Sequence, residues 1–313
     1  MGIIILFVFY TLYTICFLVP RGLLLKLSKF CAFFLSFLPI PAVDRNLKVI
    51  LNFQKLNGIT SKPKSELKRK YYYYFLKNII DFYKFLVIDP EQFYKVLKID
   101  PLFDGFLKSY EDGQGIIFAG MHLGNWELGP LVGYKYKVKM SSLVFHQISP
   151  VFESLISSLR RRYGVNLLHQ RKGIKEAINR LNDGEVLIFL GDQDGTKGGH
   201  FQKLCGMTCS YPRGIELFVK KTKAKVIPSI LVHDGDNYRL AVEPDINCDE
   251  MRESKDFNQL HQQLKSVYEK YILEYPEQWL LVYDRFKFRH DKHLQKNGLY
   301  DEVKKEHEEM FLK

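Results

Sequence analysis

The stretch Gly115-Ile-Ile-Phe-Ala-Gly-Met-His-Leu-Gly-Asn-Trp-Glu127 joins a short apolar run to a glycine-rich turn and the start of a helix. The apolar run has the length of a buried strand. Gly124 supplies the backbone freedom that a tight turn needs, and Asn125 is a suitable N-cap for the helix that follows. Because ligands bind beyond the carboxyl ends of strands in open α/β sheets, the stretch predicts an α/β fold with a site at His122.

The rest of the middle of the chain repeats this alternation of apolar runs and helical patterns. It predicts an α/β fold with a mixed central sheet flanked by helices. The expected strands are 115–119, 140–145, 165–169, 186–190, 225–232, 238–242 and 279–283. The expected helices are 67–86, 126–136, 151–163, 172–182, 212–221 and 257–275.

Composition narrows the classes of function. The 313 residues include 46 Lys+Arg and 35 Asp+Glu, a net charge of +11, which favours an anionic partner: nucleic acid, an acidic protein or a membrane leaflet. Five cysteines are too few for a disulfide scaffold, and Cys205 and Cys209 are interpreted as ordinary thiols. A hydrophobic content of 46% excludes a mainly disordered chain.

The first 40 residues are expected to form a membrane anchor and an interfacial helix. Ile3 to Val19 is apolar and uncharged, at the short limit for a bilayer span, and a buried core helix is the alternative. Basic residues follow this segment, so the positive-inside rule predicts that the remainder lies on the cytoplasmic side. The stretch 23–40 carries Lys26 and Lys29, which suit a helix lying in the membrane interface.

Three further segments complete the expected organisation. Residues 41–100 are basic and rich in aromatics, which fits an anionic membrane surface, single-stranded nucleic acid, or a solvated amphipathic helix that packs on the core. The absence of any nucleic-acid recognition signature favours the membrane surface over nucleic acid. Residues 101–293 form the expected catalytic core, and residues 294–313 a charged C-terminal surface helix with i,i+4 ion pairs.

His122 and Glu127 are the first candidates for chemistry. Five positions apart, they can meet only if His122 lies in the turn and Glu127 in the first helical turn. A histidine oriented by a carboxylate can act as a general base. The alternative is a polar strand-to-helix turn in which the histidine caps the helix.

Two other charged patterns remain open at this point. Asp192-Gln-Asp194 follows an apolar strand and resembles the metal-nucleotide site of glycosyltransferases, although aspartates are also common in turns. Arg160-Arg161-Arg162 could grip a phosphate or carboxylate, or could favour the helix dipole at a C-terminus.

Taken together and in this order, the motifs resemble the late (lauroyl/myristoyl-type) acyltransferases of lipid A biosynthesis, within the lysophospholipid acyltransferase superfamily. The matching pieces are His122-Leu-Gly-Asn-Trp-Glu127, Arg160-Arg-Arg-Tyr-Gly164, Asp192-Gln-Asp194 and Pro276-Glu-Gln-Trp279 with a basic pair soon after. The resemblance covers nearly the whole chain. The polar loop 200–212 departs from the family pattern, which leaves acceptor identity and acyl length open.

The resemblance implies an enzyme anchored by a single N-terminal pass in the cell inner membrane, with its catalytic domain on the cytoplasmic face. It would move a fatty acyl chain from an acyl-carrier-protein or CoA thioester to a hydroxyl of a lipid A precursor or related glycolipid. His122 is then the general base and Glu127 its orienting acid. Neither a cofactor nor a metal is implied. The implied partners are the acyl-carrier-protein donor, the lipid acceptor and an anionic membrane surface, with no nucleic acid.

Other residues and other functions complete the hypothesis. Substrate binding is assigned to Gly124, Asn125, Arg160, Arg162 and Asp192, and the tetrahedral oxyanion would be held by the amides near Gly124 and Asn125 or by Arg160. Phospholipid or aminolipid acceptors are alternatives within the same chemistry. The rivals are a metal-dependent glycosyltransferase that uses Asp192 and Asp194, and a membrane-tethered binding protein for an acidic partner.

Overall fold

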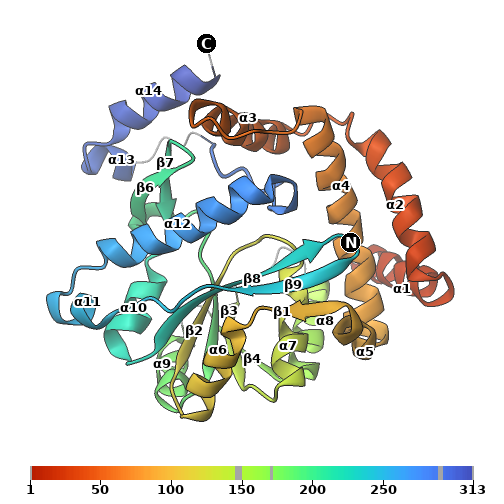
Figure 1. Ribbon diagram of the computed structural model, residues 1–313, viewed down its shortest axis with the longest axis horizontal. Helices are drawn as coiled ribbons and strands as arrows, with labels where there is room; N and C mark the ends of the chain where they lie inside the picture. The colour runs from red at the N-terminus through yellow and green to blue at the C-terminus, as the bar shows by residue number, and fades with distance from the viewer. Residues whose placement is uncertain (1, 145–149, 170–171, 288–291, 312–313) are drawn as a thin grey trace.

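The fold is built on a mixed sheet of seven strands, described from a computed structural model that covers residues 2–144, 150–169, 172–287 and 292–311 (Figure 1). The strand order is β1-β9-β8-β2-β5-β3-β4. Neighbouring strands are parallel throughout, except that β9 runs antiparallel to β8. The strands are β1 (Leu97–Ile99), β2 (Ile116–Gly120), β3 (Met140–Val144), β4 (Val165–His169), β5 (Val186–Leu190), β8 (Lys225–Asp234) and β9 (Asn237–Val242).

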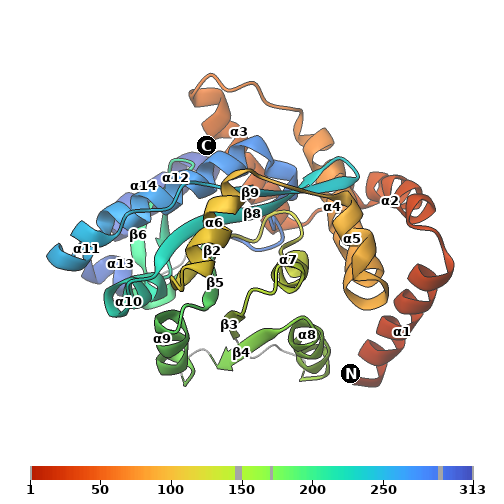
Figure 2. The ribbon, with the colours of Figure 1, turned by 60° about the horizontal axis from the view of Figure 1, so that its bottom comes forward.

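Helices flank this sheet, and in both ribbon views α3, α12 and α14 lie on the opposite side of the molecule from α7 and α8 (Figures 1 and 2). A π-helical segment, Phe82–Ile88, continues α4, and a 3-10 turn, Trp126–Leu128, precedes α7. The helices are α1 (Gly2–Leu18), α2 (Arg21–Leu35), α3 (Pro41–Leu56), α4 (Lys64–Asp81), α5 (Pro90–Val96), α6 (Leu102–Glu111), α7 (Gly129–Lys135), α8 (Pro150–Arg162), α9 (Ile174–Asn182), α10 (Gly214–Lys221), α11 (Asp249–Ser254), α12 (Asn258–Glu274), α13 (Lys292–Lys296) and α14 (Tyr300–Phe311).

The alternation of side chains along β2 divides the interior into two cores. Ile117 belongs to a large core with α3, α4, α10 and α12, whereas Ile116 belongs to a second core with α5, α6 and α7. Successive residues of a strand point to opposite faces, so a strand buried on both faces reads as a continuous apolar run. This is the pattern that marked 115–119 in the sequence.

The predicted α/β fold with a mixed, helix-flanked sheet is confirmed, with differences at particular strands. The strands expected at 165–169 and 186–190 have the observed bounds. The strand expected at 140–145 is observed as β3, Met140–Val144, and Phe145 lies outside the described residues. The strand expected at 279–283 is wrong: this segment makes one isolated bridge, Leu123 to Trp279, and then turns. Three observed strands have no counterpart among the predicted ones: β1, and the antiparallel hairpin of β6 (His200–Leu204) and β7 (Met207–Tyr211).

The expectation of a membrane-spanning N-terminal anchor needs correction. Helix α1 has 17 residues, about 26 Å at 1.5 Å per residue, against roughly 30 Å of bilayer hydrocarbon. Within the described residues, no helix combines the length and the apolar character needed to cross a membrane. Helix α1 instead lies at one edge of the molecule, beside α2 (Figure 2).

The charged C-terminal segment packs closely on the rest of the chain. It forms α13 and α14, with residues 312–313 outside the described part. Glu306 of α14 accepts hydrogen bonds from the backbone N–H (2.8 Å) and the hydroxyl (3.1 Å) of Thr208 in β7, and Val303 is buried. Helix α14 therefore covers the β6–β7 hairpin.

Candidate active site

The candidate site lies where β2 and its neighbour β5 end. His122 follows β2 and Asp192 follows β5, so adjacent parallel strands deliver both side chains to one edge of the sheet. The Nδ1 atom of His122 lies 2.8 Å from Oδ1 of Asp192, which also accepts the His122 backbone N–H at 3.1 Å. The indole Nε1–H of Trp279 donates to Oδ2 of Asp192 at 2.9 Å. Both carboxylate oxygens are thus occupied, and the acid is fixed in place.

This arrangement sets the tautomer of the histidine. Burial alone would raise the pKa of the Asp192 carboxyl, but the charge and hydrogen bonds of His122 and the hydrogen bond from Trp279 hold that pKa below its ordinary value. An ionised carboxylate is only an acceptor, so His122 carries its proton on Nδ1 and leaves the lone pair of Nε2 free to accept a proton. The His122 side chain is 18% exposed, so a substrate hydroxyl can reach it.

Glu127 has a different partner from the one predicted. Its carboxylate accepts two hydrogen bonds from Arg160, at 2.7 Å from Nη2 and 3.2 Å from Nε, and a third from the indole of Trp126 at 3.2 Å. The 3-10 turn at Trp126–Leu128 places Glu127 beside α8, while the His122 ring packs edge-on against the ring of Trp126, with centroids 5.1 Å apart. The contacts of His122 therefore run to Asp192, and Glu127 orients Arg160.

Hydrogen bonds to the protein interior fix the turn between His122 and Glu127. Gly124 has φ +68°, and a Cβ at this position would lie 1.9 Å from the carbonyl oxygen of Leu231. Its amide donates to the Gln278 carbonyl (3.0 Å), and the amide of buried Asn125 donates to the Leu231 carbonyl (3.3 Å). Both amides already hydrogen-bond within the protein, so of the oxyanion-donor candidates named above Arg160 remains.

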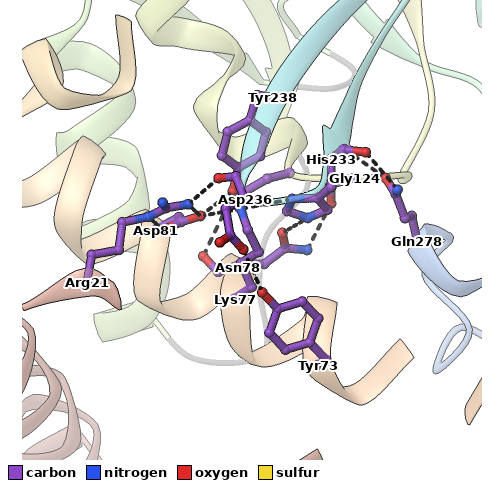
Figure 3. Close-up of polar contacts among 11 residues, drawn as sticks. Arg21, Tyr73, Lys77, Asn78, Asp81, Gly124, His233, Asp236, Tyr238 and Gln278 are labelled. Carbon is purple, nitrogen blue, oxygen red and sulfur yellow. Dashed lines mark hydrogen bonds and ion pairs between the residues drawn. The ribbon is translucent and has the colours of Figure 1, made fainter. Parts of the chain in front are cut away.

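The segment Pro276–Trp279 supports the site from behind. Gln278 hydrogen-bonds both the backbone N–H (2.8 Å) and the carbonyl (3.0 Å) of His233, while Trp279 holds Asp192. Figure 3 shows the next layer, in which Asn78 of α4 contacts Gly124 and His233. Arg162 stands apart from these contacts, with its guanidinium 5.7 Å from the ring centroid of Tyr163.

Metal binding gains no support from the carboxylates at this edge. Asp192 is buried with both oxygens hydrogen-bonded, so it has no free oxygen for a metal-nucleotide. Elsewhere in the described part of the chain, His200, Glu216 and His261 lie within metal-ligating reach of one another. There Arg213 binds both oxygens of Glu216, and His261 Nε2 lies 2.7 Å from Oε1, so the carboxylate is already partnered.

The partners of His122 were partly visible in the sequence. His122 and Asp192 each follow an apolar strand, which is the signal that could have paired them once β2 and β5 were recognised as neighbours. No local pattern links Trp279 or Asn78 to the site, because both reach it only through the tertiary fold.

The fold and site define an α/β protein with a histidine at the carboxyl edge of its sheet, hydrogen-bonded to a buried aspartate. The chain belongs to the bacterial lipid A biosynthesis acyltransferase family, whose sequence pattern matches residues 2–288. This membership confirms the family resemblance inferred from the motifs.

Individual relatives are more distant. The chain is 26% identical over 179 residues to the lipid A biosynthesis myristoyltransferase of Escherichia coli K12, covering 57% of this chain and 55% of that protein. It has the same identity and coverage with the lipid A biosynthesis acyltransferase 1 of Shigella flexneri. It is 25% identical over 190 residues to the Escherichia coli lipid A biosynthesis palmitoleoyltransferase, covering 59% and 60% of the two chains. The match thus spans somewhat more than half the length of these relatives.

Proposed function

We propose that the protein transfers a fatty acyl chain from an acyl-carrier-protein thioester to a hydroxyl of a lipid A precursor. The observation that carries this proposal is the His122–Asp192–Trp279 arrangement at the carboxyl edge of the sheet. Family membership and the names of the relatives support the choice of acyl group and lipid acceptor. The carrier-protein donor rests on the resemblance and on the net charge of +11, which suits an acidic partner.

The proposed reaction needs no covalent acyl-enzyme. His122 Nε2 takes the proton of the acceptor hydroxyl as its oxygen attacks the thioester carbonyl. Arg160, oriented by Glu127, stabilises the oxyanion of the tetrahedral intermediate. The intermediate collapses, the C–S bond breaks, and the leaving thiolate takes the proton back from His122. Asp192 stabilises the imidazolium in between, as the acid of a catalytic triad does.

We also propose that α1 and α2 lie on an anionic inner-membrane leaflet, with the catalytic edge facing the cytoplasm. The exposed residues of these helices are largely apolar, and Leu24, Leu25, Ser28 and Ala32 turn the opposite face of α2 into the protein. Lys26 and Lys29 accompany the apolar face. A helix with one face in the protein and an apolar face outside suits the membrane interface, and no span is required. The exposed apolar side chains are Ile4, Leu6, Phe7, Val8, Tyr10, Ile15, Phe17, Leu18, Leu23, Leu27, Phe30, Phe33 and Phe34.

The test is acyl transfer by purified protein in vesicles, with a defined acyl-carrier-protein thioester and a lipid A precursor. His122→Ala is expected to lower turnover by at least about 100-fold while the protein stays folded. Wild-type turnover of this variant would refute the mechanism. A glycosyltransferase would instead lose its activity in EDTA, and a binding protein would show no turnover with any acyl donor.

A further inference from the structure

Two oppositely charged side chains lie fully inside the protein, one helical turn apart on α4. Lys77 and Asp81 both have 0% exposure. Asp81 accepts hydrogen bonds from Lys77 (2.7 Å), from the hydroxyl of Tyr238 (2.6 Å) and from Arg21 (2.6 and 2.9 Å). Charges removed from water are tolerated only when their partners are well placed, so this cluster has one favourable arrangement.

The hydrogen-bond roles along the cluster can be assigned in sequence. The ammonium of Lys77 can only donate, and it lies 3.2 Å from Nδ1 of His233, so Nδ1 is the acceptor. The His233 proton is therefore on Nε2, which donates to Oδ1 of Asn78 at 2.7 Å. Since the oxygen of the Asn78 amide faces His233, its nitrogen faces Gly124 and donates to that carbonyl at 2.8 Å.

The middle of this series cannot easily shift. Gln278 holds the backbone of His233 at two points, and the ring of Tyr74 stacks on the His233 ring with centroids 4.6 Å apart. Figure 3 shows the contacts running from Arg21 on one side, through Asp81 and His233, to Gly124 on the other. Each polar group has a defined donor or acceptor role, so this series of hydrogen bonds specifies the orientation of the Gly124 peptide.

We propose that Lys77, His233 and Asn78 are positioning residues for the turn that carries His122. With Asp81 they form a hydrogen-bonded relay. Arg21, the first residue of α2, joins this relay through its two hydrogen bonds to Asp81, and it also donates to the carbonyl of Asp236 at 2.8 Å. The packing of the N-terminal helices is thereby linked to the geometry of the turn that carries His122 and Gly124. The kinetic part of this inference rests on the proposed acyl transfer, while its structural part does not.

The kinetic test compares two buried or half-buried amides replaced by apolar side chains of similar size. Asn78→Leu removes the hydrogen bonds to Gly124 and His233. Gln54→Met is the matched control, because Gln54 likewise donates to a backbone carbonyl, that of Leu273 at 3.1 Å, but lies on α3 outside the relay. We expect Asn78→Leu to lower kcat by about 10- to 100-fold with KM within about twofold, and Gln54→Met to leave kcat unchanged. An unchanged kcat in Asn78→Leu, or an effect confined to KM, overturns the positioning role.

A second readout is independent of activity. The amides of Gly124 and Asn125 are both hydrogen-bonded, so hydrogen exchange of the peptide covering residues 121–128 reports the state of the turn. Faster exchange in Asn78→Leu than in wild type and Gln54→Met supports the proposal, even if acyl transfer is not the reaction. Exchange at the wild-type rate overturns it. Arg21→Gln is expected to speed exchange of the same peptide, and a wild-type rate in this variant overturns the link to α2.

Discussion

At the scale of single residues, Asp192 is the acid that the geometry pairs with His122. Asp192→Asn keeps the shape but removes the charge that, in the proposed mechanism, stabilises the imidazolium and selects the tautomer of His122. We expect a fall in kcat of about 10²- to 10⁴-fold, with some loss of thermal stability because the new NH2 group must face an N–H of His122 or of Trp279. Steady-state kinetics of acyl transfer measures the effect.

Asp194→Asn is the matched control, since Asp194 lies two residues further along the same loop and its Oδ1 accepts from the Thr196 amide. It is expected to retain most of its activity. Equal losses in the two variants would favour a shared metal site over the proposed base.

Glu127→Gln tests the other acid. Its effect should be non-additive with that of Arg160→Ala, because the two side chains act as one unit.

Lys77 gives a prediction for stability against pH. Burial lowers the pKa of this ammonium to about 8, with Asp81 opposing and Arg21 adding to the shift. Between pH 8 and about 10 the unfolded chain therefore binds more protons at this site than the folded one, so stability rises with pH. We expect a gain of up to about 2 kcal/mol from pH 7.5 to 9.5 by denaturant unfolding. The variant Lys77→Met should lose that gain, and an identical pH dependence would contradict it.

The sequence identifies His122 correctly as a residue at a strand end, but it misjudges which acid lies beside it. Closeness in sequence favours Glu127, five residues away, whereas strand adjacency brings Asp192 from 70 residues away. Periodicity and turn signals report local structure, so they carry no information on which strands become neighbours. The contacts of Gln278, Trp279 and Asn78 with the site likewise depend on which elements become neighbours in the tertiary fold, so local patterns do not report them.

At the scale of elements, helix α2 carries an apolar face outside the protein. Phe30 and Phe34 are 65% and 55% exposed, and their rings pack on each other with centroids 5.0 Å apart. We expect Phe30→Ser/Phe34→Ser to weaken binding to anionic phospholipid vesicles by at least about 10-fold, because each ring loses its transfer to the apolar phase. Vesicle co-sedimentation measures the change.

The matched control for α2 is Leu102→Ser on α6, a residue that is 49% exposed and distant in sequence from the apolar face. It should bind vesicles like the wild type. If both variants bound equally well, α2 would not be the membrane contact.

Regular elements are the part of the fold that the sequence predicts best. A long amphipathic helix such as α12 has a clear period, and a short apolar strand such as β5 stands out as a continuous run. The segment 279–283 has the apolar composition of a strand, but it lies beside the chain that follows β2, and both edges of β2 are already paired, with β5 and β8. The three-residue β1 is too short to show a period at all.

At the scale of the whole molecule, the net charge of +11 predicts salt-sensitive encounters. Binding to anionic vesicles and the kcat/KM for an acidic carrier-protein thioester should both fall as salt rises from 50 to 500 mM, since screening shortens the reach of the charges. Neutral vesicles serve as the control and should bind weakly at either salt concentration. If kcat/KM and vesicle binding did not change with salt concentration, this result would argue against both anionic partners.

The pairing of β1 with β9 has a consequence for how the chain acquires its structure during synthesis. Leu97 lies opposite Tyr238, so the edge of the sheet stays incomplete until the ribosome has delivered about 140 further residues. Arg21 lies further still from its partner, since the carbonyl of Asp236 follows it by 215 residues. Such long-range contacts slow folding and leave early apolar surface uncovered. We therefore expect that α1 and α2 lack their final packing contacts until β9 has been synthesised. Until then, the nascent chain should depend on chaperones or on an early lipid surface to cover its apolar side chains.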